Sequence, residues 1–63
     1  MSSLEIAYNT VFDNEGNIRL CGREACKDLI IELSKKYPGV YFGNISTGML
    51  NVEEVKKYRG NLS

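Results

Sequence analysis

The segment from Gly22 to Gly39, GREACKDLIIELSKKYPG, constrains the fold more than any other part of this chain. Its apolar residues recur at helical spacing and form one continuous stripe, which consists of Cys26, Leu29, Ile30, Leu33 and Tyr37. Two lysines occupy the last turn, where the helix dipole favours cations, and the sequence Pro38-Gly39 then stops the helix. The pattern predicts an amphipathic helix, and what packs on its stripe decides the fold.

The residues before this helix predict a β-hairpin. Residues Leu4–Phe12, LEIAYNTVF, are rich in β-branched and aromatic side chains, which favours a strand. The turn formers DNEGN follow, and Asn14 or Gly16 can adopt a positive φ there at little cost. Residues Asn17–Cys21, NIRLC, then alternate as a second strand, joined to the first by a loop of about four or five residues.

Two further elements are predicted after the main helix. Residues Val40–Ile45, VYFGNI, have the composition of a third strand, which Gly43 weakens. Residues 51–54, NVEE, have the form of a capping box, in which an Asn and a Glu three residues later each bond a backbone N–H group of the other. This motif predicts a short second helix over Val52–Tyr58.

A chain of 63 residues provides for one domain, here residues 1–63. The predicted order of elements is ββαβα, which makes a small α+β domain. A right-handed crossover through the main helix gives, in the simplest arrangement, a three-stranded and mainly antiparallel sheet with strand order 2-1-3. The main helix would pack on one face of the sheet, and a short C-terminal helix would complete the domain. The opposite face would stay open, and that face or an open edge of the sheet would serve as a surface for dimerisation.

The charge balance argues against several classes of function. Eight Lys and Arg residues offset eight Asp and Glu residues, and the chain contains no His, so its formal net charge is zero. Such a chain lacks the summed field that draws most nucleic-acid and anionic-membrane binders to their targets. Near-zero charge also removes the repulsion that keeps small proteins apart, which favours self-association.

The sequence also predicts a cytoplasmic protein with no membrane partner. Its first residues lack a basic stretch followed by an apolar run, and no segment approaches the roughly 18 apolar residues of a membrane span. Two cysteines are too few for a secreted disulfide scaffold, and reduced thiols are the rule in the cytoplasm.

The residue types favour a protein-interaction or regulatory accessory module over an enzyme. Without His, a general base would have to be an Asp or Glu shifted by burial, and a core this small offers little interior for that. Aromatic side chains, by contrast, are typical anchors of protein interfaces. The candidate contact residues are Tyr37, Tyr41, Phe42, Ile45 and Val11. We expect such a module to bind a protein partner or a second copy of itself, without a cofactor.

Binding of single-stranded nucleic acid is an alternative interpretation. The pentapeptides KKYPG at 35–39 and KKYRG at 56–60 nearly repeat each other at the ends of the two predicted helices. If these ends lie side by side, they form a basic patch with rings that can stack on unpaired bases. The residues of this patch would be Lys35, Lys36, Lys56, Lys57, Arg59 and Tyr58. Two solvated helix ends, in which Lys complements the dipole, explain the same pattern.

The two cysteines give a third interpretation, a thiol-redox or metal-linked module. Cys26 would lie in the first turns of the main helix near Arg23, a setting that lowers the pKa of a thiol. Cys26 also belongs to the apolar stripe, where a cysteine acts as a small hydrophobic side chain. Cys21 and Cys26 together supply half of a structural zinc site at most, so no metal is expected within one chain.

Overall fold

The computed structural model describes residues 2–20 and 22–59, and its first element is a helix where the sequence predicts a strand. Helix α1 spans Ser3–Val11. The Ser2 hydroxyl caps it by accepting a hydrogen bond of 3.1 Å from the Glu5 N–H. Its buried side chains recur every three or four residues, at Leu4, Tyr8 and Val11. The predicted strand is wrong because burial at helical spacing outweighs the modest strand preference of these side chains.

The predicted β-hairpin is reduced to one isolated bridge between Phe12 and Ile18. The turn between them lies where the sequence predicts it, and Gly16 has a φ of 83° there. The Asp13 carboxylate holds the turn by accepting hydrogen bonds of 2.9 Å from two backbone N–H groups. Because the preceding residues are helical, no first strand remains to pair with residues 17–21; of these, Cys21 lies outside the described residues.

Helix α2 spans Arg23–Lys36 and confirms the predicted main helix. Gly22 is its N-cap residue and supplies no side-chain hydrogen bond. The apolar stripe is buried most deeply at Leu29, Ile30 and Leu33. Lys35 and Lys36 occupy the last turn, where their charges complement the helix dipole.

The predicted third strand is wrong over most of its length. Strand β1 covers only Gly43–Asn44 and pairs antiparallel with β2, Met49–Leu50. The chain reverses at once because Asn44 closes the turn that follows. Its carbonyl accepts a hydrogen bond of 2.8 Å from the Gly48 N–H, and its side chain accepts one of 2.9 Å from the Ser46 N–H.

The last helix, α3, spans Val52–Lys57, close to its predicted position. Asn51 is the N-cap residue, but its side chain makes no capping bond. The Asn51 N–H donates to the Phe42 carbonyl at 2.8 Å, and the Asn51 Nδ2 donates to the Tyr41 carbonyl at 3.4 Å. The predicted capping box is therefore wrong, because both Asn51 groups tie α3 to the segment before β1 instead.

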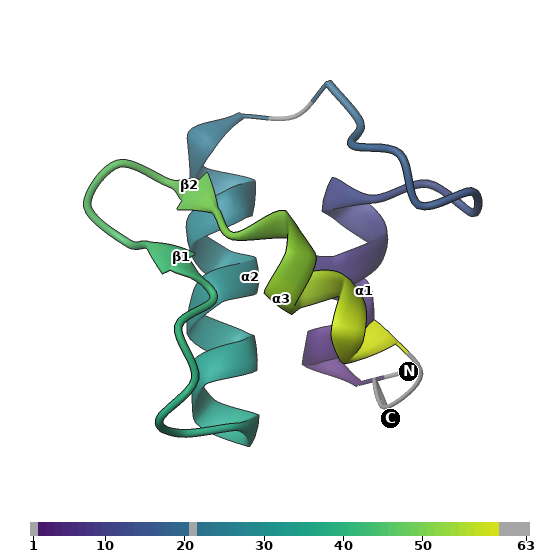
Figure 1. Cartoon of the computed structure of the whole chain (residues 1–63). Helices are drawn as coiled ribbons and strands as arrows, with labels where there is room; N and C mark the ends of the chain where they lie inside the picture. The colour runs from purple at the N-terminus through teal and green to yellow at the C-terminus, as the bar shows by residue number, and fades with distance from the viewer. Residues whose placement is uncertain (1, 21, 60–63) are drawn as a thin grey trace.

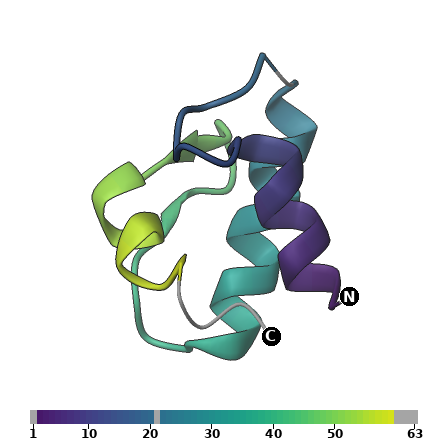
Figure 2. The same ribbon diagram turned by 90° about the vertical axis from the view of Figure 1, so that its right-hand side faces the viewer.

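The elements form two layers around one core. Helices α1 and α2 run antiparallel in one layer (Figure 1). Figure 2 shows the β-hairpin and α3 packed against one side of this helix pair. The core between the layers consists of Leu4, Tyr8, Val11, Phe12, Leu29, Leu33, Phe42 and Val55. The described residues thus form three helices and a two-stranded sheet. The fold is small and α+β, but the ββαβα order and the sheet of order 2-1-3 are wrong.

Candidate functional site

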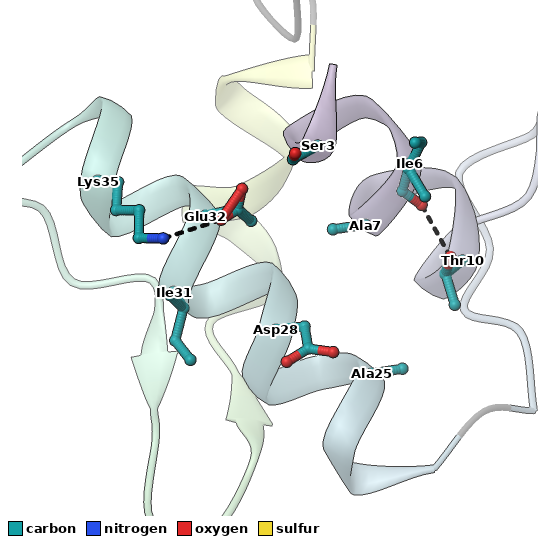
Figure 3. Close-up of a pocket in the computed structure, with 9 residues that line it drawn as sticks. All are labelled: Ser3, Ile6, Ala7, Thr10, Ala25, Asp28, Ile31, Glu32 and Lys35. Atoms are coloured by element: carbon teal, nitrogen blue, oxygen red, sulfur yellow. Dashed lines mark hydrogen bonds and ion pairs between the residues drawn. The ribbon is translucent and has the colours of Figure 1, made fainter. Parts of the chain in front are cut away.

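An open groove runs between α1 and α2, and we refer to it as the α1–α2 groove (Figure 3). Its volume is about 500 Å³. The lining comes from both helices and consists of Ser3, Ile6, Ala7, Thr10, Ala25, Asp28, Ile31, Glu32 and Lys35. On each helix these positions recur at three- or four-residue spacing and alternate with the core positions. The groove therefore lies on the side of the helix pair that faces away from the β-hairpin and α3.

The groove lining includes two small side chains, Ala7 and Ala25, and two isoleucines, Ile6 and Ile31. Ala7 and Ala25 are half-buried, and Ala7 points from α1 toward α2 (Figure 3). Ile6 is 53% exposed and Ile31 is 36% exposed. The Thr10 hydroxyl donates to the Ile6 carbonyl at 2.8 Å, so its polar group is satisfied within α1. The groove thus offers apolar surface to a partner at little polar cost.

Charged side chains reach the groove from α2. Lys35 Nζ lies 3.4 Å from Glu32 Oε2 in an exposed pair one turn apart. Asp28 is exposed, and its carboxylate makes no hydrogen bond or ion pair with another described residue. The apolar surface is therefore bordered by one neutralised pair and one carboxylate that a partner could engage.

The five contact residues predicted from the sequence are dispersed. Val11 and Phe42 are 0% and 1% exposed, so neither can reach a partner in this fold. Tyr37 is half-buried, with its ring centroid 6.3 Å from that of Phe42. Tyr41 and Ile45 are exposed on either side of β1. None of the five lines the α1–α2 groove.

The two KKY segments do meet, as the nucleic-acid interpretation requires. The ring centroids of Tyr37 and Tyr58 lie 4.4 Å apart. The Phe42 ring stands edge-on to Tyr58 at 5.3 Å. Because these rings pack on one another, their faces are only partly available for stacking on bases.

Two of the lysines at this end are paired with glutamates. Lys57 Nζ lies 3.0 Å from Glu54 Oε1, and this hydrogen bond raises the pKa of Lys57. Lys35 pairs with Glu32, one turn earlier in α2. These pairs reduce the positive field that phosphate groups would meet.

The other basic side chains differ in their surroundings. Arg59 Nη2 donates to the Asn14 carbonyl at 2.8 Å and so fastens the end of α3 to the turn after α1. Lys36 Nζ lies 5.6 Å from the centre of the Tyr37 ring, within the range of a cation–π contact. Lys56 is exposed. Among the described residues, Lys56 forms none of the three ion pairs found on the surface.

Of the two cysteines, Cys26 is described and Cys21 lies outside the described residues. Cys26 is half-buried and packs against the core, in line with its place on the apolar stripe. Within residues 2–20 and 22–59, no three His, Cys, Asp or Glu side chains gather in a way that would hold a metal ion. A redox role for Cys21 and Cys26 stays a prediction.

One buried side-chain group has no hydrogen-bond partner among the described residues, the Tyr8 hydroxyl. Tyr8 is 2% exposed, and its ring stacks on that of Phe12 with centroids 4.8 Å apart. Burial raises the pKa of this hydroxyl, and the positive charge of Arg59 partly opposes the rise. Tyr8 lies in the core rather than in the groove, so its main role is packing.

The α1 half of the groove is missed by sequence reasoning because residues 4–12 are assigned to a strand. A strand would place Ile6, Tyr8 and Thr10 on one face, whereas α1 buries Tyr8 and exposes the other two. The signal that could identify α1 is its N-terminal spacing. Ser2 and Glu5 have the S-x-x-E form of a capping box.

Comparisons with protein-family models, curated proteins and solved structures returned no match. The longest described helix, α2, has 14 residues, and no helix within residues 2–20 and 22–59 combines the length and apolar composition needed to cross a bilayer.

Proposed function

We propose that this chain is a non-enzymatic protein-interaction module that self-associates through the α1–α2 groove. The observation that carries the proposal is the apolar surface on the uncovered side of the helix pair, where Ile6 and Ile31 are exposed beside Ala7 and Ala25. Apolar side chains gathered on one exposed face are typical of interaction surfaces. A second copy is the occupant we favour, because a net charge of zero leaves no overall repulsion between copies.

The size of the molecule bears on the strength of this association. Its accessible surface is 4107 Å², so an interface of standard size, with roughly 800 Å² from each partner, would cover about a fifth of it, whereas the groove occupies only part of one side of the helix pair. We therefore expect a weak, reversible dimer that forms at high protein concentration. Weak self-association suits an accessory or regulatory protein whose assembly follows its concentration. We also infer a cytoplasmic location, which still rests on the sequence.

Sedimentation equilibrium over a concentration series tests the proposal. The expected result is a mass that rises from monomer to dimer with concentration. Nuclear magnetic resonance spectra recorded over the same series should show shifts concentrated at the backbone amides of the groove. A mass that stays monomeric at every concentration up to about 1 mM overturns the proposal.

Paired variants separate the groove from the rest of the surface. Ile31→Glu places a charge in the apolar part of the groove and should abolish the dimer. Ile45→Glu changes an exposed isoleucine outside the groove and should leave it intact. If both variants lose the dimer to the same extent, the dimer contact does not lie in the α1–α2 groove.

Single-stranded nucleic-acid binding is a second candidate function, favoured because the two KKY segments meet at Tyr37 and Tyr58 and so bring the lysines of both helix ends together. The test is fluorescence anisotropy of labelled oligo-dT and oligo-rU at two salt concentrations. Binding led by phosphates must strengthen at low salt, so no binding there excludes this candidate. Lys36→Glu should weaken binding, whereas Lys27→Glu, which makes the same charge change earlier in α2, should not.

A further inference from the structure

The charges along the groove side of α2 are arranged in a way that defines one mode of self-association. Asp28 and Lys35 both line the groove and are separated by seven residues, which is about two helical turns. The carboxylate thus lies nearer the start of α2 and the ammonium group nearer its end, with Ile31 between them on the same side. Helices charged in this way complement each other when they run antiparallel.

We propose that two copies pack α2 against α2 in antiparallel orientation, about a two-fold axis between Ile31 and Glu32, so that Asp28 of each copy pairs with Lys35 of the other. This arrangement rests on the proposed function, because it specifies how the α1–α2 groove is occupied. A two-fold contact uses the same surface on both copies, so the surface must complement itself. The Asp28–Lys35 pair meets this requirement and forms twice.

The position of the axis follows from the register. Asp28 and Lys35 lie at equal distances on either side of the point between Ile31 and Glu32, so an antiparallel copy brings opposite charges together at both ends. Near the axis the two Ile31 side chains meet and bury their exposed surface, while each Glu32, which is equally near the axis, stays neutralised by Lys35 of its own copy. Parallel helices in register would instead place Asp28 against Asp28.

The other antiparallel arrangement packs α2 of one copy on α1 of the next, and the charges disfavour it. The side chains that α1 brings to the groove are Ser3, Ile6, Ala7 and Thr10, none of which is charged. Asp28 would therefore approach the second copy without a cation to pair with. Desolvating an unpaired carboxylate is unfavourable, which leaves α2 as the better partner for α2.

Lys35 is available for the intermolecular pair although it contacts Glu32 within its own helix. Its side chain is 72% exposed, and the Lys35–Glu32 distance of 3.4 Å is that of a surface pair. Its ammonium group has three N–H donors, so it can keep its contact with Glu32 while it pairs with Asp28 of the other copy, and Glu32 is not left unpaired at the interface.

Charge reversal tests the arrangement. Asp28→Lys and Lys35→Asp each place like charges together twice, so each variant alone should self-associate at least about tenfold more weakly at low ionic strength. An equimolar mixture of these two variants should form a heterodimer, because the reversed charges then face opposite ones. The double variant Asp28→Lys/Lys35→Asp should recover the homodimer. Sedimentation equilibrium measures all four samples.

Matched controls exclude a general effect of charge and of unfolding. Glu53→Lys and Lys56→Asp make the same changes in net charge on α3, at exposed positions outside the groove. They should leave the dimer unchanged. Circular dichroism melting should show that every variant folds like the wild type, since Asp28 and Lys35 are exposed.

The outcomes separate this inference from the proposed function. If the wild type dimerises but the reversals act no differently from the controls, or the mixed variants fail to pair, the antiparallel arrangement is overturned and self-association stands. If the wild type stays monomeric, both are overturned. Weakening by each single reversal together with rescue in the mixture supports the arrangement.

Discussion

Tyr37 is the C-cap residue of α2, Tyr58 is the C-cap residue of α3, and their ring centroids lie 4.4 Å apart. The near-repeat of KKY in the sequence therefore has a packing explanation. Each copy ends a helix with lysines that complement the dipole, and each contributes one ring to a cluster that Phe42 completes. This cluster joins the second layer of the fold to the end of α2.

Tyr58→Ala should lower the free energy of unfolding by about 1 to 3 kcal/mol, because it removes a half-buried ring from two aromatic contacts. Tyr58→Phe keeps the ring and should remain close to the wild type. Urea denaturation followed by circular dichroism measures both. An equal loss in the two variants would show that the hydroxyl, rather than the ring, joins α3 to α2.

Leu29→Ala should cost about 2 to 5 kcal/mol, a large part of the stability that so small a domain can have. Leu29 is fully buried in the core between the layers. We expect the variant to unfold rather than to lose activity selectively. Leu20→Ala removes the same atoms at a fully exposed position and should change the melting temperature little. A Leu29→Ala variant with an unchanged transition would contradict the assigned core.

Tyr8→Phe should leave stability unchanged or raise it by about 1 kcal/mol, because it removes a buried hydroxyl that has no partner among the described residues. The ring stays stacked on Phe12. Tyr8→Ala, in contrast, removes the ring and should cost about 3 to 5 kcal/mol. Chemical denaturation of the two variants separates the hydroxyl from the ring. A clear loss of stability in Tyr8→Phe would mean that the hydroxyl is hydrogen-bonded in solution.

The main helix could be predicted from the sequence because Leu29 and Leu33 lie one turn apart on a long, uninterrupted stripe, and both are fully buried. Residues 4–12 form a shorter segment, whose apolar side chains fit both the two-residue period of a strand and the 3.6-residue period of a helix. Strand spacing places Ile6 with Tyr8, whereas helical spacing places Leu4 with Tyr8. Packing against α2 decides between them, and that contact is not visible in a local pattern.

The predictions for the third strand and the capping box are wrong for a related reason. Polar groups of these segments form hydrogen bonds with distant parts of the fold rather than with their sequence neighbours. Asn51 has the residue type of a helix cap, but its groups bond carbonyls of the segment before β1. The α1–α2 groove could not be predicted either, because it depends on contacts between distant segments. It requires Ala7 of α1 and Asp28 of α2 to line the same cavity, which follows only from the antiparallel packing of the two helices.

The turn after α1 should make stability depend on pH through Asp13. Hydrogen bonds from the backbone N–H groups of Asn17 and Glu15 lower the pKa of this carboxyl below its ordinary value of 3.8. The unfolded chain therefore takes up the proton at higher pH than the folded chain. The stabilisation is fully present above pH 3.8 and is lost as the pH falls through the lowered value.

Asp13→Asn keeps an oxygen that can accept the same hydrogen bonds but removes the charge. The difference in free energy of unfolding between wild type and Asp13→Asn should thus be largest near neutral pH and shrink in acid. Urea denaturation at intervals from about pH 7 to about pH 2 measures it. Asn14→Ala changes the same turn without removing the carboxyl, so its difference from the wild type should stay constant over that range. A constant difference for Asp13→Asn as well would show that the carboxylate does not hold the turn by its charge.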